Sequence, residues 1–416
     1  MQTVVSHPTG NRNVRAIISS FAKAGLLAEF FTTLSIDSKA GWLKLIPAKF
    51  RYELKRRSFP IPAEKIKSFP SLEVARMVFA KSGISYPIRH ELGWASVDSI
   101  YHLVDRKTAG HLQRLKKYKN INAVYAYEDG ALFSFRQAKN MGIKCIYDLP
   151  IAYWETTRKL MDEESRRVPA WAVTLGGSVT DSAQKVERKS EELNLADVII
   201  SPSKFVESSL PEWTKNKQII MSPFGSPDCV ATEDVRSVLI QKAEDRPLRI
   251  LFVGSMGQRK GLADLFAAMH LLKSSQFELV VMGTLRAPMQ FYKNEYGDFK
   301  YEPGRPHEKV LELMRSCDIF CLPSIVEGRA LVMQEAMSQG LPLIITPNTG
   351  GEDLIIDEKT GFLVPIRSPE KIAEKLTWFN DNRDKIPEMG LLAKEHAARY
   401  SWESYGQKVI NSLMEL

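Results

Sequence analysis

Residues 318–347 read DIFCLPSIVEGRALVMQEAMSQGLPLIITP and contain one full cycle of alternating secondary structure. The apolar run at 318–324 predicts a buried strand, the spacing of apolar residues at 330–340 predicts a helix, and the run at 341–347 predicts a second strand. A glycine ends the predicted helix, as is common at helix C-termini. Continuous apolar strands that alternate with helices indicate a parallel sheet covered by helices on both faces.

The same alternation occurs in both halves of the chain, more clearly in the second half. It predicts an α/β fold of two doubly wound, Rossmann-like domains. The further elements that we expect are strands at residues 249–255 and 277–283, helices at 260–273 and 308–316, a strand at 3–7 before a long helical stretch, and strands at 122–130, 144–150 and 197–203.

The division into domains follows from a change in composition. Residues 222–247 are rich in proline, glycine and charge and contain no clear buried strand, which is typical of an interdomain linker. We therefore expect an N-terminal domain at 1–222, a C-terminal domain at 223–398, and a final helix at 399–416 that returns to the N-terminal domain. Ligands of open parallel sheets bind beyond the carboxyl ends of the strands, so two such domains facing each other predict a cleft between them.

The overall composition is that of a globular protein. The chain has 416 residues, of which 44% are hydrophobic and 25% are charged, enough for two large domains. No apolar stretch reaches the roughly 20 residues of a membrane-spanning helix, and the N-terminus does not resemble a secretory signal, so we expect a cytoplasmic protein. The four cysteines, which are too scattered for a disulfide framework or a zinc site, are expected to be reduced structural thiols: Cys145, Cys229, Cys317 and Cys321.

The positive charge is concentrated in the first half. Residues 1–225 carry a net charge of +12 and residues 226–416 a net charge of −4. Residues 41–68 contain eight basic side chains interleaved with aromatic and apolar ones. This pattern suits the anionic surface of a membrane at its inner face, and it equally suits an amphipathic helix packed on its own domain.

Two glutamates mark the loop and helix that follow the strand at 318–324. Glu327 lies in the loop, and Glu335 lies inside the helix on an apolar face where an ionised carboxylate needs a partner. Gly328 permits close backbone approach, and the N–H groups at the helix start, residues 329–331, suit a phosphate. A solvated glutamate near a helix start, where the helix dipole favours it, is the alternative interpretation.

A second cluster follows the strand at 249–255, where residues 253–262 read VGSMGQRKGL. Gly254 and Gly257 allow a tight turn, and Arg259 and Lys260 stand at a helix start, where cations are unfavourable unless an anion binds. A diphosphate fits this arrangement, although two solvated basic residues are also possible. The sequence matches neither a P-loop nor a GxGxxG fingerprint.

The block at residues 248–364 resembles a known family. VGSMGQRKG, the spacing from Glu327 to Glu335, EAMSQGLPLI, GGEDLI and GFLV are similar to the glycosyl transferases group 1 domain of retaining glycosyltransferase family 4. The resemblance implies the GT-B fold, in which the C-terminal domain binds a nucleotide-sugar donor and the N-terminal domain binds the acceptor. It further implies transfer with retained anomeric configuration through an oxocarbenium-like transition state.

Roles for individual residues follow from the resemblance. Glu327 would contact the donor sugar, Glu335 the ribose hydroxyls and Lys260 the diphosphate, with Glu327 and Lys260 as catalytic residues. The sequence has no DxD motif, so we expect the diphosphate to be neutralised by cations and helix-start amides without a metal. The complete expected donor site consists of Gly254, Ser255, Arg259, Lys260, Glu327, Gly328, Arg329, Ala330, Leu331, Glu335 and Gly350.

The acceptor side departs from the family pattern. Many members carry a histidine where this chain has Tyr127, at the exit of the strand at 122–130. A tyrosine is a poor base at neutral pH, so Asp129 is our candidate for the catalytic group that positions the acceptor hydroxyl, with a turn aspartate as the alternative. Gly10 and Asn11 stand in the loop that replaces the family's glycine-rich loop, and they complete the expected acceptor side.

The sequence thus predicts a metal-independent hexosyltransferase that uses a nucleotide sugar, such as a UDP- or GDP-sugar, and no further cofactor. The expected acceptor is a saccharide or a lipid-linked molecule in surface polysaccharide biosynthesis, and the expected location is cytoplasmic, with a peripheral position on the inner membrane face. A nucleotide-sugar epimerase with the same fold is the alternative enzyme. A basic nucleic-acid-binding protein is a more distant one, because the sequence contains no recognisable nucleic-acid-binding motif.

Overall fold

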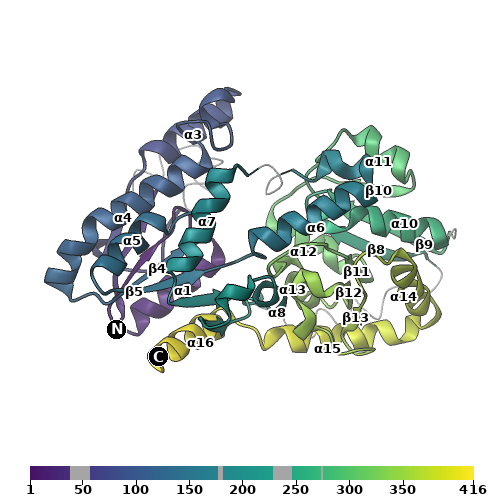
Figure 1. The fold of residues 1–416 in the computed structure, drawn as a ribbon. Helices are drawn as coiled ribbons and strands as arrows, with labels where there is room; N and C mark the ends of the chain where they lie inside the picture. The colour runs from purple at the N-terminus through teal and green to yellow at the C-terminus, as the bar shows by residue number, and fades with distance from the viewer. Residues whose placement is uncertain (38–56, 177–180, 228–245, 273–274) are drawn as a thin grey trace.

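The computed structural model describes residues 1–37, 57–176, 181–227, 246–272 and 275–416, and these residues form two α/β bodies side by side (Figure 1). The N-terminal body contains a parallel sheet of order β3-β2-β1-β4-β5-β6-β7. Its strands are β1 (Thr3–Ser6), β2 (Leu27–Thr32), β3 (Ile66–Ser68), β4 (Ala123–Tyr127), β5 (Lys144–Asp148), β6 (Val198–Ser201) and β7 (Gln218–Met221). The helices of this half of the chain are α1 (Arg12–Lys23), α3 (Ser71–Ser82), α4 (Val97–Lys119), α5 (Leu132–Asn140), α6 (Trp154–Arg167), α7 (Ala183–Leu195) and α8 (Lys204–Ser208), with 3-10 turns η2 (Ala63–Lys65), η3 (Tyr86–Ile88), η4 (Pro169–Thr174) and η6 (Glu212–Thr214).

The C-terminal body repeats the same plan with a parallel sheet of order β10-β9-β8-β11-β12-β13. Its strands are β8 (Leu248–Val253), β9 (Phe277–Met282), β10 (Phe299–Glu302), β11 (Ile319–Leu322), β12 (Leu343–Ile345) and β13 (Gly361–Leu363). The helices are α10 (Leu262–Leu272), α11 (Met289–Glu295), α12 (His307–Arg315), α13 (Leu331–Ser338), α14 (Pro369–Asp381), α15 (Ile386–Ala398) and α16 (Trp402–Met414), with 3-10 turns η7 (Gln258–Lys260), η8 (Pro347–Thr349), η9 (Glu352–Leu354) and η10 (Arg383–Lys385).

Both sheets are doubly wound, as the sequence predicts. In the N-terminal body, the core on one face of the sheet includes residues of α1 and α16, and the core on the other face includes residues of α4, α5 and α7. The strand order reverses between β1 and β4 in one sheet and between β8 and β11 in the other. Loops that leave neighbouring strands in opposite directions separate at such a point, so both sheets have a crevice at the carboxyl ends of these strands.

The predicted long helical stretch after residue 7 is wrong in its second part. Helix α1 ends at Lys23, Gly25 adopts a positive φ of 71°, and the chain continues as the fully buried strand β2. In a continuous apolar run, the spacing of apolar residues does not distinguish a buried strand from a buried helix, so the pattern alone did not separate the two. The edge strand β10, with the sequence FKYE, is also absent from the expected elements, because its charged residues interrupt the apolar run.

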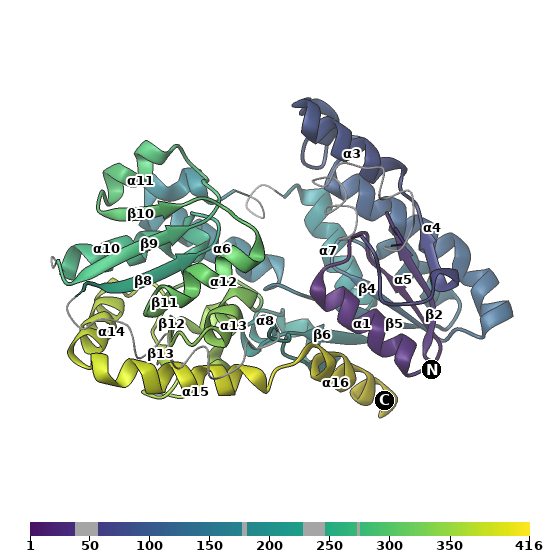
Figure 2. The ribbon, with the colours of Figure 1, turned by 180° about the vertical axis from the view of Figure 1, so that it is seen from behind.

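Helix α16 packs along α1 in the N-terminal body (Figure 2). Gly406 lies so close to α1 that a Cβ at this position would stand 2.1 Å from Ser20 Oγ. Lys23 and Glu403 form an ion pair at 2.9 Å, and Tyr405 is buried in the core shared with α1. The last helix of the chain is therefore part of the N-terminal body.

The expected division at residue 222 assigns residues 154–174 to the N-terminal domain. In the structure, α6 and η4 lie in this segment and pack on the C-terminal body. Trp171 of η4 is buried in the core of that body, with its ring 5.0 Å from Phe291, and its Nε1 donates to Glu295 at 2.7 Å. Arg167 of α6 binds Asp264 of α10 through two hydrogen bonds of 2.8 Å. The chain therefore crosses between the bodies here as well as near residues 222–226 and 399–401.

Some sequence expectations concern residues outside the described ranges. Residues 41–56 of the basic segment, most of the linker and Cys229 are in this group. The remaining cysteines, Cys145, Cys317 and Cys321, are buried and outside disulfide bonds, as expected. Among the described helices, none is both long enough and apolar enough to cross a membrane.

The close contact between the two bodies at Gly328 leads us to expect that Gly328→Ala destabilises the protein. A Cβ at Gly328 would lie 1.8 Å from the carbonyl oxygen of Pro150, so the two bodies would have to move apart. We expect Gly328→Ala to lower the free energy of unfolding by about 1–3 kcal/mol, measured by denaturant titration. Gly110→Ala is the control, because Gly110 lies in α4 with nothing within 4 Å of a Cβ, and it should raise stability by up to about 1 kcal/mol. Equal effects of the two substitutions would contradict this interpretation.

Candidate active site

A cavity of about 1470 Å³ lies between the two bodies. Its N-terminal wall is formed by the loops after β1 and β4, and its C-terminal wall by residues near α12 and α13. The four acceptor-side residues expected from the sequence, Gly10, Asn11, Tyr127 and Asp129, all line this cavity. On the other wall, three of the expected donor-side residues line it: Arg329, Leu331 and Glu335.

Asp129 is held in a strained backbone conformation at the exit of β4. Its φ is 67°, and its N–H donates to Glu192 Oε2 of α7 at 2.8 Å. Two lysines of α7 lie near its carboxylate, with Lys185 Nζ at 3.7 Å and Lys189 Nζ at 3.9 Å. Burial raises the pKa of Asp129, while the two ammonium groups oppose this shift. Strained polar residues at strand exits are often functional, so the position agrees with a role in binding.

Its neighbour Glu128 is more deeply buried. Burial raises the pKa of Glu128 to about 7, and Lys189 opposes the shift from 3.7 Å. A carboxyl with this pKa exists in both protonation states near neutral pH, which general acid–base groups require. Glu128 also lines the cavity, although the sequence analysis did not select it.

His7 is a second cavity residue that the sequence analysis did not select. It follows β1 directly and is 4% exposed, and its ring packs against Tyr127 with 4.6 Å between centroids. Its Nδ1 lies within hydrogen-bond distance of both the carbonyl oxygen of Thr9, at 2.5 Å, and the backbone nitrogen of Thr9, at 3.0 Å. Burial lowers the pKa of His7 to about 4, which keeps the ring neutral near pH 7.

A histidine at this position was accessible to sequence reasoning. It stands directly after the first predicted strand, and loops after strands are where the ligands of parallel sheets bind, whereas Tyr127 and Asp129 were selected from the family resemblance. The pairing of β1 with β4 aligns Ser6 with Ala126, so the next residues, His7 and Tyr127, stand side by side. The sequence alone did not define which strands are neighbours.

On the C-terminal side, Glu327 and Lys260 point toward each other, as the predicted donor site requires. Lys260 Nζ lies 2.6 Å and Arg259 NH1 lies 2.9 Å from the same oxygen of Glu327. Glu327 is 8% exposed and Lys260 is 9% exposed, so the cluster lies behind the cavity surface. Burial lowers the pKa of Lys260, whereas the charge of Glu327 raises it.

Backbone contacts between loops position this cluster. The N–H of Ile325 donates to the carbonyl of Arg259 at 2.9 Å, and the N–H of Glu327 donates to the carbonyl of Asn348 at 3.0 Å. The stem of Lys260 lies over Gly254, where a Cβ would stand 3.4 Å from Lys260 Cε. The loops after β8, β11 and β12 are therefore tied together at the carboxyl ends of their strands.

Glu335 faces the cavity from α13 and has partners from both bodies. His307 Nε2 of α12 lies 3.0 Å from its Oε1, and Arg12 NH1 of α1 lies 3.8 Å from the same atom. A carboxylate at this position is accessible from the cavity, which suits hydrogen bonding to ligand hydroxyls. The ion pair between Arg12 and Glu335 crosses the gap between the bodies.

Three residues of the expected donor site form hydrogen bonds within the protein. The N–H of Ala330, expected to be free, donates to Thr349 O at 3.1 Å because the loop after β12 lies against it. The guanidinium of Arg329 is buried and binds Asp353 at 2.6 Å and the carbonyl of Gly350 at 3.1 Å, so its charge is compensated within the C-terminal body although the residue lines the cavity. The carbonyl of Ser255 accepts from Gly257 at 2.8 Å within its own turn.

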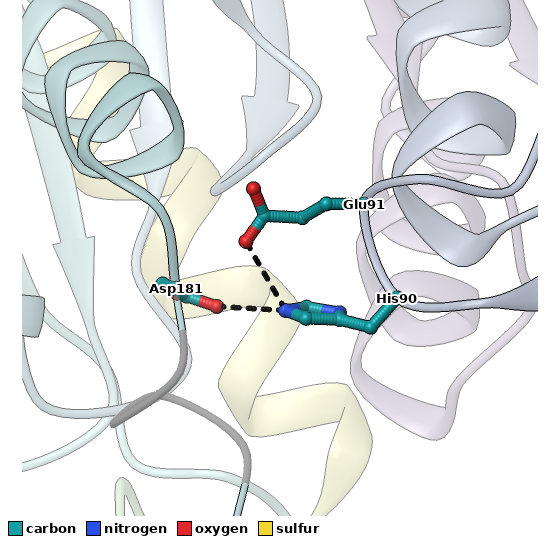
Figure 3. A group of neighbouring side chains, drawn as sticks. All are labelled: His90, Glu91 and Asp181. Carbon is teal, nitrogen blue, oxygen red and sulfur yellow. Dashed lines mark hydrogen bonds and ion pairs between the residues drawn. The ribbon is translucent and has the colours of Figure 1, made fainter.

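His90, Glu91 and Asp181 form a group of potential metal ligands beside the cavity (Figure 3). His90 Nε2 lies 3.2 Å from an oxygen of each of the two carboxylates. However, Lys189 Nζ lies 3.1 Å and Lys185 Nζ lies 3.4 Å from Asp181 oxygens. Burial alone would raise the pKa of Asp181, but these two ammonium groups hold it below its usual value. With its charge already compensated, the group fits an ion-pair network better than a cation site.

Residues 239–396 match the family model described as "Glycosyl transferases group 1". Over 210 residues the chain is 26% identical to an uncharacterized glycosyltransferase of Methanocaldococcus jannaschii, covering 50% of this chain and 56% of that protein. Over 174 residues it is 31% identical to a D-inositol 3-phosphate glycosyltransferase of Corynebacterium urealyticum, covering 42% of this chain and 37% of that protein.

A putative colanic acid biosynthesis glycosyltransferase of Escherichia coli is 28% identical over 186 residues, covering 41% of this chain and 44% of that protein. The alignments thus span about half or less of each curated relative. Structural similarity extends over the whole chain. A sucrose-phosphate synthase from Thermosynechococcus elongatus has a TM-score of 0.65 at 16% identity and covers 100% of this chain and 99% of its own. The Anabaena protein HepE in complex with UDP has a TM-score of 0.62 at 14% identity, with 100% of both chains covered.

The solved neighbours share the arrangement of two facing parallel-sheet bodies, so the predicted GT-B fold is confirmed. The family match falls on the body that contains β8 to β13 and the Glu327–Lys260 pair. Residues 239–396 thus match the glycosyl transferases group 1 model, in a chain that has the GT-B fold.

Proposed function

We propose that this protein is a glycosyltransferase that moves a hexose-type unit from a nucleotide-sugar donor to a saccharide or lipid-linked acceptor, with retained anomeric configuration. The observation that carries the proposal is the buried cluster of Glu327, Lys260 and Arg259 at the carboxyl ends of β8 and β11. Solved neighbours in complex with UDP, and with UDP-glucose, support a uridine nucleotide as the first donor to test.

In the proposed mechanism, the donor diphosphate takes the place that Glu327 now occupies beside the two cations. Lys260 and Arg259 both contact the same oxygen of Glu327. A diphosphate would offer them several oxygens and a larger total negative charge. Glu327, once released, is free to accept hydrogen bonds from sugar hydroxyls. The two cations would then neutralise the charge that develops on the leaving nucleoside diphosphate.

Glu335 and the acceptor wall complete the proposed site. Glu335 faces the cavity and would bind the ribose hydroxyls in exchange for its contact with His307. Across the cavity, Asp129 and the neutral ring of His7 would orient the acceptor hydroxyl toward the sugar. A place in surface polysaccharide biosynthesis and a cytoplasmic location are part of the proposal, and the relative in colanic acid biosynthesis supports the first.

The test begins with ligand binding. We expect UDP or GDP to raise the unfolding temperature, since a ligand at one hundred times its dissociation constant adds about 2.7 kcal/mol of stability. The matching sugar nucleotides are then incubated with the enzyme and candidate acceptors, and the products are identified by NMR. Transfer with an unchanged anomeric configuration supports the proposal, whereas conversion of the donor sugar to an epimer without any acceptor would identify an epimerase.

Lys260→Ala is expected to lower the turnover number about 100- to 1000-fold, because it removes a cation from the developing diphosphate charge. Lys300→Ala is the matched control, since Lys300 forms an exposed ion pair with Glu278 on β10 and β9. Steady-state kinetics measure both variants, and thermal unfolding checks that they are folded. A turnover number for Lys260→Ala within about twofold of wild type would contradict the assignment.

Chelation is expected to leave activity unchanged. In the proposed site, Lys260 and Arg259 provide the positive charge that a metal would otherwise supply. The measurement compares initial rates in EDTA, in EDTA followed by excess Mg²⁺, and in untreated enzyme. Loss of activity in EDTA that Mg²⁺ restores would show that a cation is required and would refute this part of the proposal.

His7 offers a pair of substitutions that separate its two ring nitrogens. His7→Gln keeps a polar atom near Nε2, and His7→Asn keeps one near Nδ1, which contacts Thr9. We expect His7→Asn to lower the rate of transfer to the acceptor about tenfold, the effect of one lost hydrogen bond. His7→Gln should keep most of the wild-type rate. Nucleotide-induced thermal shifts should stay equal in both variants. The reverse ranking in transfer would mean that His7 acts only through its contact with Thr9.

A further inference from the structure

Helix α3 (Ser71–Ser82) has an inverted pattern of burial. Val74 is 45% exposed and Val78 is 58% exposed, whereas Glu73 is 1% exposed and is the residue that the helix buries. Surface helices of globular proteins normally turn their apolar side chains inward and their charges toward water. The apolar edge of α3 therefore faces away from its own body.

Ion pairs explain why this helix is oriented with a carboxylate inward. Glu73 Oε1 lies 2.6 Å from Arg57 NH2, and Glu73 Oε2 lies 3.0 Å from Arg76 Nε. A buried carboxylate with two guanidinium partners is strongly destabilised when one partner is removed, so these contacts hold the helix in this rotation. The exposure of Val74 and Val78 is thus built into the fold.

Further exposed apolar side chains follow along the chain. Figures 1 and 2 show α3 at the outer end of the N-terminal body. The turn η3 and the loop that follows pack on this helix, and the Phe79 and Trp94 rings lie 5.5 Å apart. We call the set the α3–η3 apolar surface; its members and exposed fractions are Val74 (45%), Val78 (58%), Ile84 (50%), Tyr86 (75%), Leu92 (77%), Trp94 (54%) and Val97 (53%).

The charges around this surface are mainly positive. Described residues 57–97 include six lysines and arginines and three glutamates. Arg57 and Arg76 pair with the buried Glu73, and Lys65, Lys67, Lys81 and Arg89 then stand against Glu64 and Glu91. Lys81 and Arg89 are exposed within the same segment as the apolar side chains. Tyrosine and tryptophan, here Tyr86 and Trp94, are the side chains that prefer the boundary between lipid and water.

We propose that the α3–η3 apolar surface docks on a lipid bilayer that contains anionic lipids. Protruding apolar and aromatic side chains with nearby cations fit a headgroup region, where the apolar groups enter the acyl boundary and the cations meet lipid phosphates. The proposal uses described residues alone, and the expected contact of residues 41–56 is not needed for it.

Docking in this way would bring the cavity next to the bilayer. Val97 belongs to the α3–η3 apolar surface and also lines the cavity, and His90 lines the cavity from the same loop. An acceptor whose lipid chain stays in the bilayer would therefore reach the cavity from this edge. This last step rests on the proposed function, whereas membrane binding itself does not depend on it.

The test is flotation of the full-length protein with vesicles in a density gradient, without substrates. Vesicles of phosphatidylcholine are compared with vesicles that contain phosphatidylcholine and phosphatidylglycerol. We expect flotation with the anionic vesicles, and the double variant Tyr86→Ser with Leu92→Gln should reduce the bound fraction about tenfold. The matched control is Tyr118→Ser with Leu271→Gln, because Tyr118 is 71% and Leu271 is 54% exposed at other places on the molecule.

Flotation of wild type and of the control variant, with loss in the Tyr86→Ser and Leu92→Gln variant, supports the proposal. Absence of flotation in wild type, or equal flotation of the two double variants, overturns it. Light scattering is run in parallel, and a wild-type oligomer that the Tyr86→Ser and Leu92→Gln variant dissociates would assign the surface to a second copy of this chain. Because nucleotide binding is measured separately, failure of the glycosyltransferase proposal would leave the flotation result interpretable.

Discussion

The buried ion pair between Glu327 and Lys260 holds together the two loops that form the candidate donor site. Each of these side chains is less than one-tenth exposed, and neither charge is stable at this depth without the other. The pair joins the loop after β8 to the loop after β11, the two central strands of the sheet. With Arg259 as a third member, the cluster leaves one positive charge in excess, which is the condition for attracting an anionic ligand.

Close contacts that involve the backbone fix the position of the two bodies relative to each other. Gly328 lies against the carbonyl of Pro150, and Ser203 Oγ donates to the carbonyl of Gly328 at 2.6 Å. Helix α6 adds a polar interface, in which Glu164 accepts hydrogen bonds from Gln258 and from Arg167. Polar interfaces of this kind usually permit relative movement of domains, so the buried donor cluster and the open cavity are compatible with a ligand that enters between them.

The opposite wall of the cavity has a different electrostatic character. Glu128, Asp129 and Glu192 come close together there, and Lys185 and Lys189 lie among them. Burial raises the pKa of Glu192 to about 8, so this carboxyl holds a proton more readily than an exposed glutamate does. The wall therefore combines hydrogen-bond acceptors, ammonium groups and a neutral histidine, which is suitable for neutral hydroxyl groups. On the C-terminal side, the two cations of the donor cluster lie behind the cavity surface.

Much of the fold could be predicted from local pattern. Apolar runs and helical periodicity are properties of neighbouring residues, and they correctly indicated β8, β9, β11 and α13 to within a few residues. The resemblance to the glycosyl transferases group 1 domain implied that Glu327 and Lys260 belong to one donor site, and parallel topology brings the loops after their strands to the same edge of the sheet. The short strand β3 and the edge strand β10 were not predicted, because their mixed polar sequences have no distinct period.

What the sequence by itself determined is therefore the class of fold and the loops in which the chemistry lies, since both depend on residues close together in the chain. The tertiary structure alone decided that His7 stands beside Tyr127, that Arg12 meets Glu335, and that the guanidinium of Arg329 turns toward Asp353. It also decided that α6 packs on the other body and that α3 buries Glu73. These outcomes arise from packing and charge compensation between elements far apart in sequence, and no local pattern encodes which distant partner a side chain will find.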